Sequence, residues 1–134
     1  MVLRTATVIL RGSGILALLL GLLFWGGTAL NLISIHMLLG LLMVLALWVI
    51  GVLQLYGKYQ QRGLAVSALL LGLAIIVLGL RQSSLLVGPQ HWVISLTHLL
   101  LGGLGVVLGQ ISAGRALAKQ PPAGSASRVP AQPH

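Results

Sequence analysis

Four long runs of apolar residues, separated by short polar stretches, dominate the pattern along this chain of 134 residues. The runs cover approximately residues 8–25, 32–56, 64–80 and 92–111. Each approaches the roughly 20 residues that a helix needs to cross a bilayer. The stretches between them contain turn-forming residues, for example Gly26-Gly27 and Gly88-Pro89. The pattern therefore predicts an all-α membrane protein, with four transmembrane helices in a single bundle over residues 1–115.

The C-terminal segment, residues 116–134, has a different composition. It is rich in Pro, Ala, Ser and Gly and shows no apolar periodicity. Such a composition is typical of a disordered tail. We assign no role to His134, which belongs to it.

The positive charges predict how the helices are oriented. The net charge is +8, with no Asp or Glu, and only Arg81 lies at the ends predicted to face the outer side. The positive-inside rule then predicts an up-down-up-down bundle with both termini in the cytoplasm, N-in/C-in, in a bacterial inner (cytoplasmic) membrane. A cleavable signal peptide is the competing interpretation of the first run, but no convincing cleavage site follows Trp25. The seven residues on the inner side are Arg4, Arg11, Lys58, Arg62, Arg115, Lys119 and Arg128.

Composition excludes several kinds of chemistry. The absence of Asp and Glu rules out a carboxylate pair, a Ser-His-Asp triad and side-chain sites for Mg²⁺ or Ca²⁺. The absence of Cys rules out disulfides, Cys-ligated zinc, iron–sulfur clusters and covalently attached haem. The basic residues are distributed among the apolar runs and do not form one basic patch. They therefore predict contact with lipid headgroups and no binding of nucleic acid. Whether the chain is an enzyme stays open, and we do not expect catalysis from it on its own.

Two histidines lie inside the predicted spans, each four residues before a glycine. They belong to His36-Met37-Leu38-Leu39-Gly40 on the second span and His98-Leu99-Leu100-Leu101-Gly102 on the fourth. An ionisable residue in a span is costly and indicates a functional site. The second and fourth spans would run in the same direction and lie diagonally across the bundle. Because neutral imidazoles ligate iron, we predict that His36 and His98 are the two axial ligands of one haem b per chain.

Helical geometry places small residues on the face of His98. At ~100° per residue, Gly102, Gly105 and Gly109 share this face, as does Ser95. The face of His36 carries Gly40, Met43, Leu47 and Gln54. Glycines alone favour close helix packing, whereas glycines beside facing histidines favour space for a planar ring. Gly40, Gly102 and Gly105 are therefore predicted to border the haem.

The pairing leaves alternatives open. His98 is expected a few residues deeper than His36, an offset of about 6 Å that helix tilt could absorb. His91 is the rival second ligand, and otherwise we expect it at the haem edge together with Arg81. Ser34, or a backbone carbonyl one turn before each ligand, would hold the other imidazole nitrogen. Met43 as a ligand, and two histidines that only make hydrogen bonds between helices, are further alternatives.

An internal repeat supports the bundle. Ala17-Leu18-Leu19-Leu20-Gly21-Leu22 on the first span recurs as Ala68-Leu69-Leu70-Leu71-Gly72-Leu73 on the third. Together with the two His-x-Leu-Leu-Gly segments, it predicts two helical hairpins related by a pseudo-twofold axis.

The chain resembles the small four-helix transmembrane b-type cytochromes, in which haem lies between histidines on facing helices. The resemblance covers about residues 8–112. It rests on His36 and His98, on Gly40 and Gly102, and on the bundle topology. It implies electron transfer between a membrane quinone and a partner protein, usually through two haems. This chain has no histidine in the inner halves of its spans, so we expect one haem near the outer side, and a partner or a homodimer to complete the electron path.

A function without a cofactor competes with this interpretation. The chain would then be a structural or accessory subunit of a larger membrane complex. Small residues on the third span, which would contact lipid, a partner or the first span, suit that role. They are Ala65, Ala68, Gly72 and Gly79. A transporter or channel finds no support, because neither an intramembrane charge nor a broken helix is expected.

Overall fold

The computed structural model describes residues 1–56 and 61–119, and every regular element in this part of the chain is a helix. Four helices are long: α1 (Val2–Trp25), α2 (Ile33–Tyr56), α3 (Arg62–Arg81) and α4 (His91–Ala118). Two short 3₁₀ turns, η1 (Leu30–Leu32) and η2 (Gln82–Ser84), lie in the connections. By length and composition, each of the four helices can cross a membrane. The prediction of an all-helical integral membrane protein is confirmed. Lys58, Arg128 and the tail beyond Lys119 lie outside the described residues.

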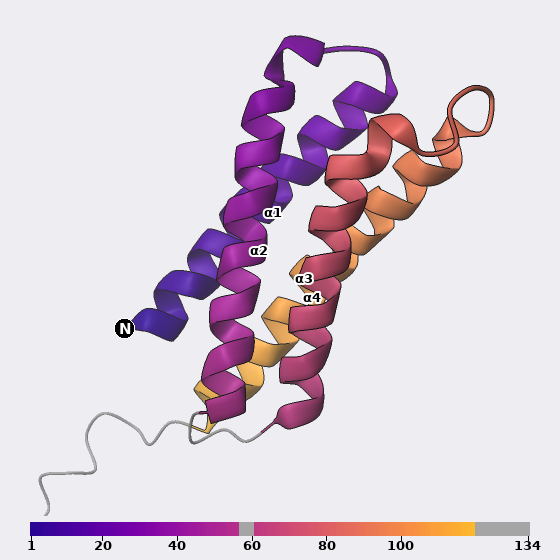
Figure 1. The fold of residues 1–134 in the computed structure, drawn as a ribbon. Coiled ribbons are helices and arrows are strands. Elements are labelled where there is room, and N and C mark those ends of the chain that lie inside the picture. Colours follow the sequence, from indigo (N-terminus) through magenta and orange to yellow (C-terminus); the bar gives the residue numbers. More distant parts are fainter. Residues whose placement is uncertain (57–60, 120–134) are drawn as a thin grey trace, which may run out of the picture.

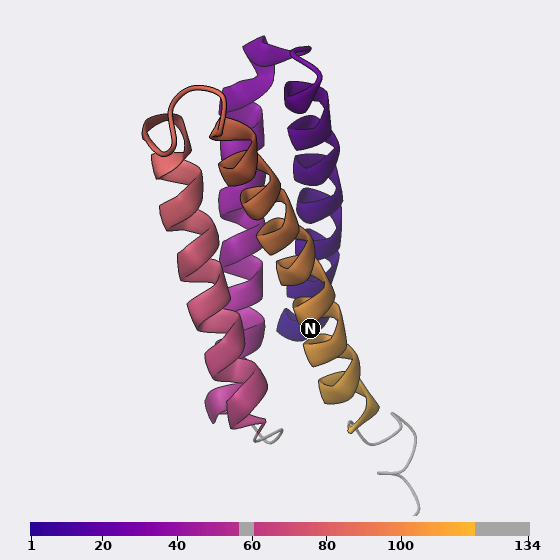
Figure 2. The same cartoon turned by 90° about the vertical axis from the view of Figure 1, so that its right-hand side faces the viewer.

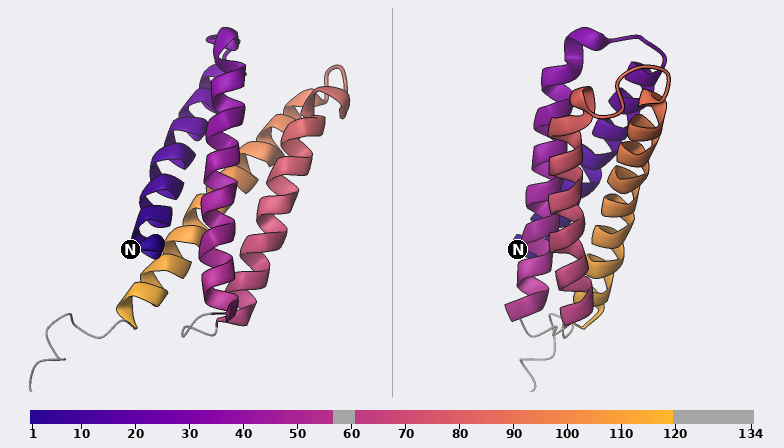
Figure 3. Two further views of the ribbon diagram at one scale, coloured as in Figure 1. Left: turned by 60° about the vertical axis from the view of Figure 1, so that its left-hand side comes forward. Right: turned by 45° about the vertical axis from the view of Figure 1, so that its right-hand side comes forward.

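The four helices form one bundle (Figure 1). The α1–α2 and α3–α4 connections lie at the same end of the bundle, and two further views show α2 and α3 side by side (Figures 2 and 3). α1 and α3 each pack against both α2 and α4. α2 and α4 also contact each other across the bundle, so the predicted diagonal pairing of these two helices is confirmed.

Both connections at this end contain a glycine in a left-handed conformation. Gly27 has a φ of 72° and Gly88 a φ of 104°. Residues with a Cβ atom rarely adopt such angles, so these two glycines allow the chain to reverse between helices.

α1 begins six residues earlier than its apolar run. Leu3, Ala6 and Leu10 are buried at helical spacing, and they belong to the same core cluster as Ala113 and Ala116 of α4. α4 correspondingly continues to Ala118, into the first residues of the predicted tail. The two extensions thus contribute to one apolar cluster. Arg11, near the start of the predicted run, is preceded by nine further residues of α1.

The small-residue face of α4 is buried, as its spacing predicts. Side chains from other helices fill it. A Cβ atom at Gly109 would lie 2.6 Å from Cδ2 of Leu10, and one at Gly105 would lie 3.0 Å from Cδ1 of Ile75. These glycines therefore serve close helix packing. The buried members of the face are Gly102, Gly105, Gly109, Ser112, Ala113 and Ala116.

The repeated glycines do not occupy equivalent places in two matching hairpins. Gly21 of α1 faces the ring of His36, and Gly72 of α3 faces the ring of Trp48. Both rings belong to α2, whereas a pseudo-twofold axis between hairpins would direct Gly72 toward α4. Trp48 Nε1 donates a hydrogen bond to the backbone oxygen of Leu69 at 3.1 Å. Trp48 is thus a packing residue between α2 and α3.

Candidate functional site

His36 and His98 lie next to each other inside the bundle. Their ring centres are 6.3 Å apart and their ring planes meet at 63°. α4 is inclined to α2 in Figure 1. The two rings meet although His36 is the fourth residue of α2 and His98 the eighth residue of α4. The structure thus juxtaposes the two histidines that the sequence paired.

α1 holds the ring of His36. Nδ1 of His36 lies 3.0 Å from the backbone oxygen of Ala17, at hydrogen-bonding distance. Cε1 would lie 3.6 Å from a Cβ atom at Gly21, and the ring of Phe24 contacts the imidazole edge-on with ring centres 5.3 Å apart. With Nδ1 donating to a carbonyl, the imidazole presents Nε2 as its free lone pair.

α3 holds the ring of His98 without bonding to it. Cε1 of His98 would lie 3.0 Å from a Cβ atom at Gly79, so the ring packs directly against the backbone of α3. Nδ1 of His98 is buried, and none of residues 1–56 and 61–119 gives it a hydrogen bond. A buried polar atom without a partner is costly and is a natural position for a ligand.

The donor chemistry of two neutral imidazoles fits a haem iron. Metal–nitrogen bonds of roughly 2 Å from both rings to one ion would leave the imidazole centres roughly 6 Å apart, close to the observed 6.3 Å. The surroundings are packed, however: Leu18 Cδ2 lies 3.6 Å from the Cβ position of Gly102, and Leu99 Cδ1 lies 3.8 Å from that of Gly21. The two imidazoles therefore fit as iron ligands, whereas a haem macrocycle would fit only if these leucine side chains moved. Within the described residues, no cluster of three or more His, Cys, Asp or Glu side chains forms a metal site.

The other residues predicted near the ring have different surroundings. A Cβ atom at Gly40 would meet nothing within 4 Å, so this glycine makes no close approach. Gly102 and Gly105 are buried against Leu18 and Ile75. Met43 is 2% exposed and packs between Gly14 and Gly105 in the core.

Ser34 is not the partner of His36. Its side chain is exposed, and the carbonyl of Ala17 takes the bond instead. The predicted alternative, a backbone carbonyl one turn before the ligand, is wrong for His36, because the carbonyl that accepts the bond belongs to α1 and not to α2.

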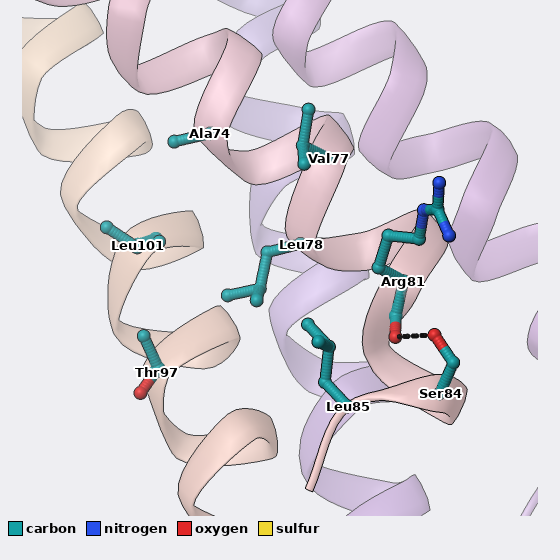
Figure 4. Close-up of a pocket in the computed structure, with 8 residues that line it drawn as sticks. All are labelled: Ala74, Val77, Leu78, Arg81, Ser84, Leu85, Thr97 and Leu101. Atoms are coloured by element: carbon teal, nitrogen blue, oxygen red, sulfur yellow. Dashed lines mark hydrogen bonds between the residues drawn. The ribbon is translucent and has the colours of Figure 1, made fainter.

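His91 and Arg81 lie at the loop end of the bundle. A ring nitrogen of His91, the first residue of α4, lies 3.2 Å from the backbone oxygen of Leu85. Arg81, the last residue of α3, lines an open groove of about 550 Å³ between α3 and α4 (Figure 4). Thr97, the neighbour of His98 in the chain, lines the same groove. His91 lies two helical turns, ~10 Å, before His98 on the same helix.

Sequence reasoning missed the residues that support the two rings. Ala17, Gly21 and Phe24 surround His36, and Gly79 supports His98. The spacing of Ala17, Gly21 and Phe24 at i, i+4 and i+7 places them on one helix face, which was the available signal. Gly79 was predicted to face lipid, a partner or the first span, and the structure places it against α4 instead. Ala65, Ala68 and Gly72 of the same stripe are buried, with Ala65 and Ala68 beside Gly51 of α2 and Gly72 against Trp48.

Comparison of the chain with protein-family models, characterised proteins and solved structures finds no match.

Proposed function

We propose that this chain is an integral membrane haem b protein of the cytochrome b type, in which His36 and His98 ligate one haem. The juxtaposition of the two imidazoles, with ring centres 6.3 Å apart on helices α2 and α4, carries this proposal. The bond from His36 to the carbonyl of Ala17 supports it, because metal-binding histidines commonly donate their second ring nitrogen to a backbone oxygen.

The surrounding residues suit a single redox centre. Haem would supply one-electron chemistry at the iron. The chain contributes two neutral ligands and an apolar, carboxylate-free setting. Arg81 and His91 at the loop end would reach groups at the ring edge. Electrons would pass to a quinone or to a partner protein, with no catalysis by this chain alone, and a homodimer is one way to lengthen the path.

The proposed orientation follows from charge. In an up-down-up-down bundle with both termini in the cytoplasm of a bacterial inner membrane, the α1–α2 and α3–α4 connections face outward. The histidine pair would then lie nearer the outer surface, because His36 is the fourth residue of α2.

The visible spectrum of the detergent-purified protein tests the proposal. Reduced-minus-oxidised spectra should show the sharp α and β bands of a six-coordinate b haem, at about one haem per chain. His36→Ala and His98→Ala should each abolish these bands, whereas the matched control His91→Ala should keep them. A wild-type protein expressed with excess haem that shows no such bands, or single variants that retain them, would overturn the proposal.

A second candidate function is that of an accessory subunit without a cofactor. The leucine side chains packed around the histidine pair favour it, since they leave no prepared space for a ring. The two histidines would then be interhelical packing groups. Co-purification of the native protein with a larger membrane complex, with no haem bound to this chain, would select this function.

A further inference from the structure

Two arginines of α1 line a groove at the end of the bundle opposite the histidine pair. Arg4 and Arg11 are exposed and two helical turns apart on the same face, ~10 Å along the axis. The groove has a volume of about 640 Å³ and lies between α1 and the end of α4. Its other lining residues include Thr7, Ile15 and Leu117. It therefore combines two guanidinium groups with apolar walls.

Arg11 lies deep for a charged residue. The side chains of its neighbour Leu10 and of Leu47 on α2 both lie against Gly109 of α4. Leu47 precedes Tyr56, the last residue of α2, by nine residues, which is ~14 Å of helix. A charge at such depth in a span is costly unless its head reaches the interface or finds a partner of opposite charge.

No side chain among residues 1–56 and 61–119 supplies a partner of opposite charge. Arg11 donates a hydrogen bond of 2.6 Å to Oε1 of Gln110, which orients the guanidinium but does not neutralise it. The whole sequence contains no Asp or Glu side chain. Nε2 of Gln110 is itself buried and has no hydrogen-bond acceptor within the described residues. The groove thus presents the guanidinium groups of Arg4 and Arg11, and no carboxylate side chain of the protein compensates them.

We infer that this groove binds one anionic phospholipid, with its phosphate between Arg4 and Arg11 and an acyl chain along Ile15 and Leu117. Guanidinium groups match phosphate oxygens in charge and geometry. A lipid fits both parts of the groove, because its phosphate can contact the arginines while its acyl chain contacts the apolar walls. The site is separate from the histidine pair, so it holds whether or not the chain binds haem.

Thermal unfolding in a neutral detergent, with added phosphatidylglycerol or phosphatidylcholine, tests this inference. Phosphatidylglycerol should raise the unfolding midpoint of the wild-type protein more than phosphatidylcholine does, and native mass spectrometry should retain one such lipid. Arg4→Gln with Arg11→Gln should remove the preference, with a loss in affinity of roughly fivefold for each arginine. The matched control, Arg62→Gln with Arg115→Gln, removes two exposed charges outside the groove and should keep the preference.

Two further variants keep the test valid if the double glutamine variant does not fold. Arg4→Lys with Arg11→Lys preserves charge and should retain a weakened preference. Gln110→Leu leaves both arginines but frees Arg11, and should also weaken the preference.

Four results would overturn the inference. Equal effects of the two lipids would exclude an anionic headgroup. Equal losses in the groove and control variants would reduce the effect to general surface charge. If inorganic phosphate stabilised the protein as well as phosphatidylglycerol does, the ligand would be a free anion and not a lipid. If an acidic partner protein were lost only from the groove variants, the arginines would belong to a protein interface.

Discussion

Gly79 of α3 lies against the imidazole of His98, so closely that a Cβ atom at Gly79 would be 3.0 Å from Cε1. The ring has no hydrogen bond to any residue in the described part of the chain, so this backbone contact is what positions it from the α3 side. The position of one proposed iron ligand therefore depends on the absence of a side chain on another helix.

Gly79→Val is expected to displace His98 and to reduce haem binding without touching a ligand. Overpacking of this kind costs about 1–3 kcal/mol of stability as well. Haem content per folded protein, from absorbance and size-exclusion chromatography, checks the prediction. Gly103→Val is the matched control, since a Cβ atom there meets nothing within 4 Å. Equal haem content in both variants would show that the contact does not position the ligand.

Gly72→Ala is expected to destabilise the bundle. A Cβ atom at Gly72 would clash with Nε1 of Trp48, and it would lie 2.9 Å from Cδ1 of the same ring. The variant must displace a ring that is hydrogen-bonded to Leu69, at a cost of about 1–3 kcal/mol. Reversible unfolding in mixed micelles measures the change. Gly40→Ala has open space at its Cβ position and should be neutral or stabilising by up to about 1 kcal/mol.

Gln54→Met is expected to change stability by less than about 1 kcal/mol, although Gln54 is fully buried. Its Nε2 donates a 2.7 Å hydrogen bond to the backbone oxygen of Ser112. Its Oε1 has no partner within the described residues, and neither does the hydroxyl of Ser112. The substitution therefore loses one bond but also removes one unsatisfied oxygen, and these terms offset each other. A loss above about 2 kcal/mol would indicate that Oε1 is bonded in the membrane, for instance to a buried water.

Single cysteines test the proposed orientation without background, because the chain has no cysteine. Ser84→Cys, at the η2 turn, should react with a membrane-impermeant maleimide added to intact cells. Thr5→Cys, near the start of α1, should react only after lysis. Reversed labelling would contradict the assignment of both termini to the cytoplasm, while leaving the bundle itself unaffected.

The predicted histidine pair shows what a single sequence can reach. The positions of His36 and His98 in their spans, and the direction of those spans, were enough to pair them. The sequence was not enough to identify the hydrogen-bond partner of His36, because a hydroxyl at Ser34 and a carbonyl on α1 are equally able to accept a hydrogen bond. Only the approach of α1 to α2 selects Ala17.

The sequence by itself determined the class of the protein and the approximate extent of its helices. Hydrophobicity and turn formation are properties of a few consecutive residues, so apolar runs bounded by Gly and Pro reveal the spans directly. The small-residue face of α4 was visible for the same reason, since helical periodicity is local.

Only the tertiary structure decided what each small residue faces. The ring of His98 packs against Gly79, the ring of Trp48 packs against Gly72, and leucine and isoleucine side chains pack against the glycines of α4. It also extended α1 back to Val2, six residues before the predicted apolar run. These outcomes depend on helix tilt and rotation, which are set by the packing of all four helices together and are not encoded in any single segment.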